Sequence, residues 1–239
     1  LIRVAQLRTA DLSRFHVLVL PDQAAEQKYL DGLGEKGIAR VTDWVNAGGT
    51  LIAIGEAVSF LASEDVELLD VAPESAVISL KPGWKAQRVD GRLPGRLLAN
   101  DDDFRAAIQA RNEQPDSAPG AILTARTNPD HWLTAGMGDR VHVLTGGRGI
   151  FTPIRLDKGV NAAVFLGAGE VVASGYLWKE NREQIASKPL AVVQKQERGL
   201  VIGITADPNY RGFTDGASLL FLNAVFRGPS HAGSLPSDE

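Results

Sequence analysis

The chain has 239 residues, of which 44% are hydrophobic and 23% are charged, and its formal net charge is −4. A chain of this size and composition can bury a substantial core, as one large domain or two small ones. The weakly negative charge disfavours nucleic acid as a partner, and no apolar run approaches the roughly 20 residues that a membrane-spanning helix needs. Cysteine is absent, which excludes disulfides, thiolate metal ligands and a cysteine nucleophile.

The first part of the chain alternates strand and helix patterns. The run HVLVLP, residues 16–21, is continuously apolar and of strand length, as in strands buried on both faces of a parallel sheet. From about Glu35 the apolar residues recur with helical spacing, a second strand follows at 50–54, and a second helix begins near Glu56. This order predicts a flavodoxin-like α/β fold, with a mostly parallel sheet and helices on both faces.

The middle of the chain is less regular. Residues 81–118 are rich in Pro, Gly and charge, and we expect an irregular excursion that contains a short helix, DDDFRAAIQA. Further strands are predicted in the segments GAILTAR, VHVLT and NAAVFL. The segment LAVVQKQERGLVIGIT predicts an antiparallel hairpin that turns at 197–199.

The end of the chain predicts a helix and a tail. The segment GASLLFLNAVF is apolar almost all round, so we expect a closing helix that is buried on every side. Residues 229–239 are rich in Pro, Ser and Gly and are expected to form a flexible tail, which leaves 1–228 as one domain. The start, LIRVAQL, has neither an initiator Met nor a signal-peptide pattern, and we interpret the chain as a domain of a longer protein.

Metal and nucleotide sites have little support in the sequence. The four histidines are His16, His131, His142 and His231, none belongs to an H-E-x-x-H motif, and we expect no metal site. The segment GLGEKG fits a dinucleotide-binding pattern, but ten residues separate it from the preceding strand, so we expect no cofactor. His131 lies in a polar turn, where a structural role is favoured over that of a general base.

One strand runs directly into a helix through a tight turn. In GGTLIAIGEAVSFLA the junction consists of Gly55, Glu56 and Ala57. Many hydrolases hold their nucleophile on such an elbow, above the carboxyl end of a strand.

Several segments carry a resemblance to a known family. They are WVNAGGTLIAIGEA, HWLTAGM, FTPIRLDKGVNAAVF, ASGYLW, KPLAVVQ, GLVIGITADPNYRGFTDG and LLFLNAVFRGP. In this order they resemble the C-terminal region of large secreted bacterial zinc carboxypeptidase-like proteins, a domain that is itself similar to class I glutamine amidotransferases. The resemblance spans about Val17 to Pro229. It implies that zinc and peptidase chemistry belong to an N-terminal domain of the longer protein.

The resemblance also bears on the elbow. Class I amidotransferases carry a cysteine there, and this chain has Gly55 or Glu56 at the corresponding place. Gly55 has no side chain, and a carboxylate is poorly suited to amide hydrolysis. The resemblance therefore implies a non-catalytic accessory domain, a pseudoenzyme, whose partner is the peptidase domain of the same protein. It also implies a periplasmic or secreted location.

Two other functions stay open. The first is an unconventional hydrolase that uses Glu56, His131 and Asp207 at the carboxyl ends of the strands, where open α/β sheets bind ligands. The second is a binding module, with Gly55, Glu56 and Arg211 around a peptide, a sugar or a small anionic ligand. Arg211 is either an anion anchor or a structural clamp, which would hold Asp207, four residues before it, or the loop carbonyls of the elbow.

Overall fold

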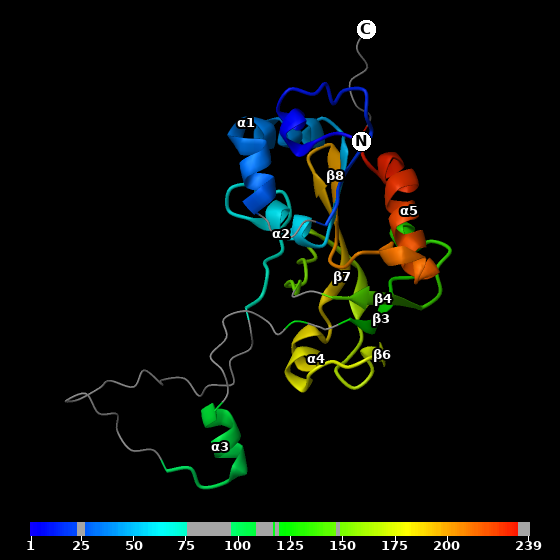
Figure 1. The fold of residues 1–239 in the computed structure, drawn as a ribbon. Helices are drawn as coiled ribbons and strands as arrows, with labels where there is room; N and C mark the ends of the chain where they lie inside the picture. Colours follow the sequence, from blue (N-terminus) through cyan, green and yellow to red (C-terminus); the bar gives the residue numbers. More distant parts are fainter. Residues whose placement is uncertain (23–26, 76–96, 109–116, 118–119, 147–148, 234–239) are drawn as a thin grey trace, which may run out of the picture.

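The structure is a computed structural model that describes residues 1–22, 27–75, 97–108, 117, 120–146 and 149–233. Figure 1 shows the chain path. The strands are β1 (Val17–Leu20), β2 (Thr50–Ile54), β3 (Ala121–Thr127), β4 (Arg140–Thr145), β5 (Gly159–Phe165), β6 (Val172–Ser174), β7 (Pro189–Gln196) and β8 (Gly199–Ile204). The helices are α1 (Gln27–Asn46), α2 (Glu56–Ala62), α3 (Asp101–Ile108), α4 (Lys179–Ile185) and α5 (Asp215–His231), and the 3-10 turns are η1 (Val4–Arg8), η2 (Trp132–Thr134) and η3 (Tyr210–Gly212).

The fold is a mixed α/β fold around one sheet. Its strand order is β1-β2-β8-β7-β5-β3-β4, and β6 pairs with β3. Only the pairs β1–β2 and β2–β8 are parallel, whereas β8–β7, β7–β5, β5–β3, β3–β4 and β3–β6 are antiparallel. The expectation of a mostly parallel sheet is therefore wrong. β3–β4 and β7–β8 join consecutive strands without a crossover helix, and such connections produce antiparallel pairs. β5 and β7 also pair antiparallel, although β6 and α4 lie between them in the chain.

The parallel part of the sheet is covered on both faces, as predicted. Leu51 and Ala53 of β2 face a core shared with α1 and α2, whereas Ile52 belongs to a core shared with α5. Every residue of β2 and β8 is buried. Burial on both faces explains why these strands are continuous apolar runs in the sequence.

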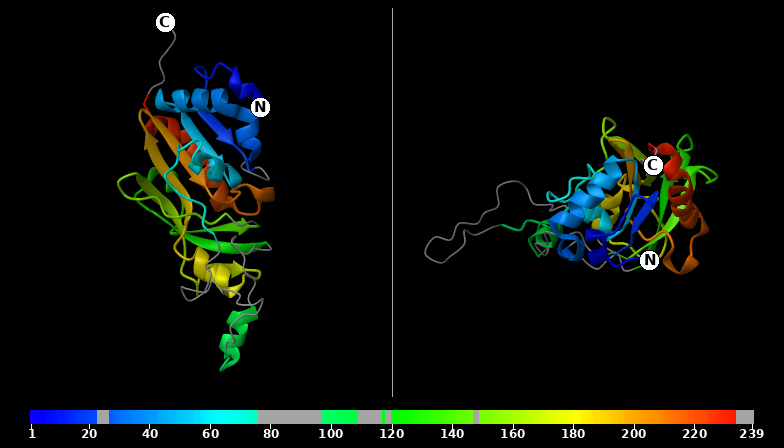
Figure 2. Two further views of the ribbon diagram at one scale, coloured as in Figure 1. Left: turned by 90° about the vertical axis from the view of Figure 1, so that its left-hand side faces the viewer. Right: turned by 90° about the horizontal axis from the view of Figure 1, so that it is seen from above.

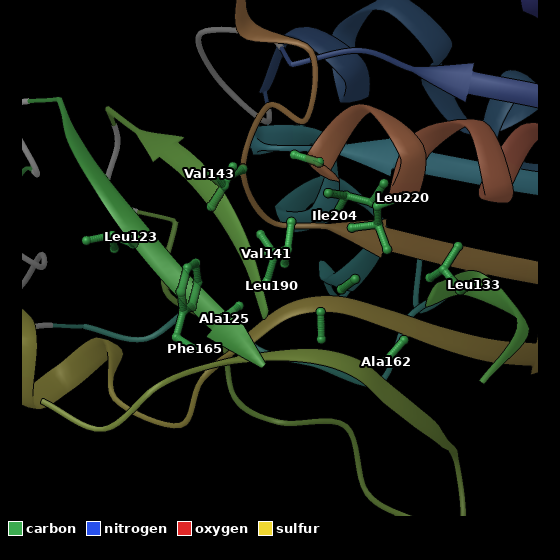
Figure 3. Packing of buried hydrophobic residues seen from close by; sticks show 14 of the residues in the cluster. Leu123, Ala125, Leu133, Val141, Val143, Ala162, Phe165, Leu190, Ile204 and Leu220 are labelled. Atoms are coloured by element: carbon green, nitrogen blue, oxygen red, sulfur yellow. The ribbon is translucent and has the colours of Figure 1, made fainter. Parts of the chain in front are cut away.

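The sheet curls so that one helix reaches both of its edges. α5 packs against β1 and β2 at one end of the strand order and against β4 at the other. Figure 2 shows α5 lying along the sheet on the side opposite α1. Inside the curl, Leu123, Val141, Leu190 and Leu220 meet in a single core (Figure 3).

Several predicted elements are confirmed. β1, β2, α2 and the short helix α3 lie where the sequence places them, and the β7–β8 hairpin turns at residues 197–198. The helix predicted from about Glu35 is the second part of α1, because Gly34 has non-helical angles (φ 57°, ψ 175°) that divide it from a first part beginning at Gln27. Most of the excursion predicted at 81–118 lies outside the described residues.

The closing helix differs from its prediction in two ways. α5 continues to His231, past the boundary expected at residue 228, because Pro229 is accommodated within the helix. It is also not buried on every side, since Leu222 is 46% exposed and Phe226 is 77% exposed. Its buried face, with Leu220 and Ala224, is the face toward the sheet.

Candidate functional site

The elbow is a sharp turn between β2 and α2. Gly55 has φ 56° and ψ −123°, a combination that residues with a side chain rarely adopt. Its N–H donates to the carbonyl of Ile204 at 2.8 Å, so the turn is tied to the end of the neighbouring strand β8. The predicted strand-to-helix elbow is therefore present, with glycine at its apex.

Asp22 fills the space beside this glycine. A Cβ atom built on Gly55 would lie 2.5 Å from both Cγ and Oδ1 of Asp22. The same Oδ1 accepts a hydrogen bond from the backbone N–H of Glu56 at 3.0 Å. A carboxylate from the end of β1 thus occupies the place where the side chain of an elbow residue would begin.

A pocket of about 580 Å³ opens at this edge of the sheet. One side comes from the segments that follow β1, β2 and β8 and is mostly polar, with Asp22, Glu56, Thr205, Asp207 and Tyr210 beside Gly55 and Ala206. The other side comes from β4, β5, α4 and their connections; it is mostly apolar, with Leu144, Ile150, Phe165, Leu177 and Ile185, but it also includes Thr145 and Asn181. Three carboxylates line the pocket, and no Lys, Arg or His is among its described lining residues.

The predicted residues Glu56 and Asp207 are therefore brought together, but Arg211 is not part of the pocket. The Oδ1 atom of Asp207 accepts from the N–H of Asn209 at 2.8 Å and caps its own turn. The Arg211 side chain is exposed, and its guanidinium carbon lies 5.4 Å from the centre of the Tyr210 ring. The predicted clamp between Arg211 and Asp207 is wrong, because Arg211 takes part in none of the ion pairs between described residues.

His131 lies elsewhere, at the start of η2. Its Nδ1 accepts from the N–H of Leu133 at 3.2 Å, and its ring lies 5.3 Å from the ring of Trp132. Burial of the ring lowers the pKa of His131, and the positive charge of His231 lowers it further. The structural role that the sequence favours for this histidine agrees with its contacts, and His131 is absent from the described lining of the pocket.

The described part of the chain offers neither a metal cluster nor a membrane-spanning helix. No group of three or more His, Asp or Glu side chains is placed to hold a metal ion among the described residues. Among those same residues, no helix has both the length and the apolar character that crossing a membrane requires.

Sequence reasoning missed Asp22 and Tyr210. Asp22 directly follows the strand-and-proline segment HVLVLP, and the ends of parallel neighbours such as β1 and β2 meet at one sheet edge. That signal was present in the sequence. The position of Tyr210 depends on η3, whose left-handed residue Arg211 (φ 49°) has no local signature.

Comparisons with known proteins find no matching family model and no matching curated protein. Among solved structures, the chain is similar to the cytoplasmic protein STM3548 from Salmonella typhimurium, with 13% identity, a TM-score of 0.49, and coverage of 93% of this chain and 77% of that one. A putative GMP synthase protein from Thermoplasma acidophilum has 12% identity and a TM-score of 0.49, with 92% and 76% covered. A putative ThuA-like protein from Parabacteroides merdae has 11% identity and a TM-score of 0.49, with 96% and 76% covered. Likeness at this level carries no inference about activity.

Proposed function

We propose that this chain is a non-catalytic binding domain with a class I glutamine amidotransferase-like fold. The observation that carries the proposal is the closed elbow: Gly55 is at its apex, and the carboxylate of Asp22 lies where an elbow side chain would begin. The resemblance of its segments extends the proposal to the longer protein. In this proposal the domain accompanies the peptidase domain of an exported zinc carboxypeptidase-like protein, and zinc belongs to that other domain.

Two groups that acyl transfer needs are compromised at the elbow. A nucleophile requires a side chain at the apex, and glycine supplies none. An oxyanion hole uses the backbone N–H of the residue after the nucleophile, here Glu56. That N–H already donates to Asp22, so an incoming carbonyl oxygen would have to displace a carboxylate.

The pocket supports a binding role. Its lining combines apolar side chains with a smaller number of polar ones, the usual make-up of a site that fixes a small ligand by shape and a few hydrogen bonds. Three carboxylates among its described lining residues favour a neutral or cationic ligand, such as a peptide or a sugar, over a small anion. The exposed position of Arg211 gives no support to an anion anchor.

The rival hydrolase has less support. It needs His131 within hydrogen-bond reach of Glu56 or Asp207. Glu56 and Asp207 share the pocket, but the Nδ1 of His131 is bonded within η2.

The test is a pair of measurements on the purified chain. Hydrolysis of glutamine and of nitrophenyl esters and glycosides should stay at the level of buffer, both for the chain and for its Glu56→Gln and Asp207→Asn variants. A turnover that disappears in those two variants but persists in Arg211→Ala would establish an enzyme instead. In parallel, calorimetric titration with neutral and basic peptides and with oligosaccharides should detect a ligand whose affinity falls in Asp207→Asn and is unchanged in Arg211→Ala.

A further inference from the structure

Leu133 makes several of the contacts between η2 and α5. Its side chain is fully buried in the core beside Leu220 of α5 (Figure 3). Its carbonyl accepts from the side-chain amide of Asn223 on α5 at 3.0 Å, and the same amide reaches the carbonyl of Ala135 at 2.9 Å. Its N–H donates to His131. The side chain and carbonyl of Leu133 therefore hold η2 against α5, and its N–H is bonded within the turn.

The bond from Leu133 fixes the protonation state of His131. A ring nitrogen that accepts a hydrogen bond carries no proton, so Nδ1 is unprotonated and the ring is neutral when this bond is present. A protonated imidazole has N–H groups at both nitrogens and is a donor only. The N–H of Leu133 would then face another donor, and a buried amide would lose its partner.

A second histidine meets the same turn from α5. The ring of His231, in the last turn of α5, stacks on Trp132 with 4.4 Å between ring centres and an angle of 13°. The positive charge of His231 opposes protonation of His131. Protonation of both histidines would place two like charges next to Trp132, whose ring lies near both imidazoles.

The other charged groups around the contact are few. η2 (Trp132–Thr134) and β5, which packs against it, contain no titratable side chain. α5 also carries Asp215 and Arg227, and the loop before η2 carries Asp130, whose side chain is exposed. Among these groups, His231 is the one whose charge shifts the titration of His131.

We propose that His131 is a proton-sensitive latch between η2 and the C-terminal end of α5. With the ring neutral the latch is closed, because Nδ1 caps η2 and keeps Leu133 and Trp132 in place under the helix. With the ring protonated the cap is lost, η2 loosens, and the last turn of α5 separates from Trp132. The latch lies apart from the pocket and does not depend on the proposed binding function.

The direction of the response follows from the burial of His131. Its neutral form is favoured in the closed state, so opening takes up a proton wherever the pH is below the ordinary histidine pKa of about 6.5 and above the lowered pKa of the closed latch. In that window the opening constant should rise about tenfold for each unit by which the pH falls. Below the lowered pKa the opening constant should become constant again.

The experiment follows amide exchange and histidine titration in the intact chain by NMR between pH 7.5 and 4.5. After correction for the intrinsic pH dependence of exchange, the Leu133 amide and the amides of the last turn of α5 should exchange faster as His131 titrates. His131→Asn and His131→Asp keep an acceptor at the start of η2 that does not titrate like imidazole. Both variants should abolish the pH-dependent rise, and one of them suffices if the other fails to fold.

His231→Gln is a second variant. It removes both the opposing charge and the ring that stacks on Trp132, but it leaves His131 and its bond to Leu133 in place. The pH-dependent rise in Leu133 exchange should therefore persist and move to higher pH. The latch is refuted if His131 titrates without a change in Leu133 exchange, or if His131→Asn keeps the same pH-dependent rise. It is also refuted if His231→Gln abolishes the transition while His131 still titrates.

Discussion

The closed elbow makes a quantitative prediction for Gly55→Ala. The new Cβ would lie 2.5 Å from the Asp22 carboxylate in a backbone conformation with φ +56°. Such a conformation costs roughly 1–3 kcal/mol for a residue with a side chain. Forcing Asp22 aside adds roughly 1–3 kcal/mol and weakens its bond to the Glu56 N–H. The free energy of unfolding should therefore fall by about 2–6 kcal/mol, or Tm by at least about 4 °C at this chain length.

Two other glycines separate the steric cost from the backbone cost. Gly212 has φ +65° with nothing within 4 Å of a built Cβ, so Gly212→Ala should lose only about 1–2 kcal/mol. Gly138 has open space and no positive φ, so Gly138→Ala should be neutral or slightly stabilising. Urea denaturation measures all three variants together with Asp22→Ala/Gly55→Ala, which should recover part of the loss. The reasoning fails if Gly55→Ala costs no more than Gly212→Ala, or if removal of Asp22 recovers nothing.

Three further variants test the packing. Gly199→Ala should destabilise the fold by more than about 4 kcal/mol, because its Cβ would lie 1.9 Å from the carbonyl oxygen of Val45. A soluble variant with an unchanged midpoint of urea unfolding would contradict this prediction. Arg211→Ala should change the free energy of unfolding by less than about 0.5 kcal/mol, since the side chain is exposed and lies over the Tyr210 ring at 5.4 Å. A loss of several kcal/mol would support the structural clamp. Leu220→Ala should lower the free energy of unfolding by about 2–5 kcal/mol, because Leu220 is fully buried. Phe226→Ala should lower it far less, because Phe226 is 77% exposed. Equal losses in thermal unfolding would refute the assignment of the buried face of α5.

The sequence predicts those parts of the fold whose signals are local. The elbow is readable because a five-residue apolar strand, a glycine and a helix start follow one another directly between Thr50 and Ala62. The β7–β8 hairpin is readable because two apolar runs are joined by two residues. The directions of β3, β4 and β5 have no such local signal. They depend on which strands become neighbours in the sheet, and packing between distant segments decides that.

The candidate site also has some residues whose position the sequence predicts and others whose position it does not. Gly55 and Glu56 follow β2 and Asp207 follows β8, two strands that the sequence predicts, so their meeting at one sheet edge could be expected. Asp22 was overlooked, although it follows the first strand, because it has no motif of its own. The isolation of His131 from these residues could not be expected, because it results from the curl that brings η2 and β4 under α5.

α5 connects the two regions on which the proposals depend. Asp207 and Tyr210, which line the pocket, come just before its first residue, and His231, which stacks on Trp132, is its last. A helix of 17 residues is about 25 Å long, so His231 at its end is well separated from the pocket residues that precede its start. Ala217, Leu220 and Ala224 between them are fully buried, and breaking their contacts would cost far more than one histidine cap stabilises. Opening of the latch should therefore stop at the last turns of α5 and leave the pocket unchanged. If ligand binding were lost at low pH to the same extent in the unmodified chain and in His131→Asn, the loss would have to arise from the pocket carboxylates and not from the latch.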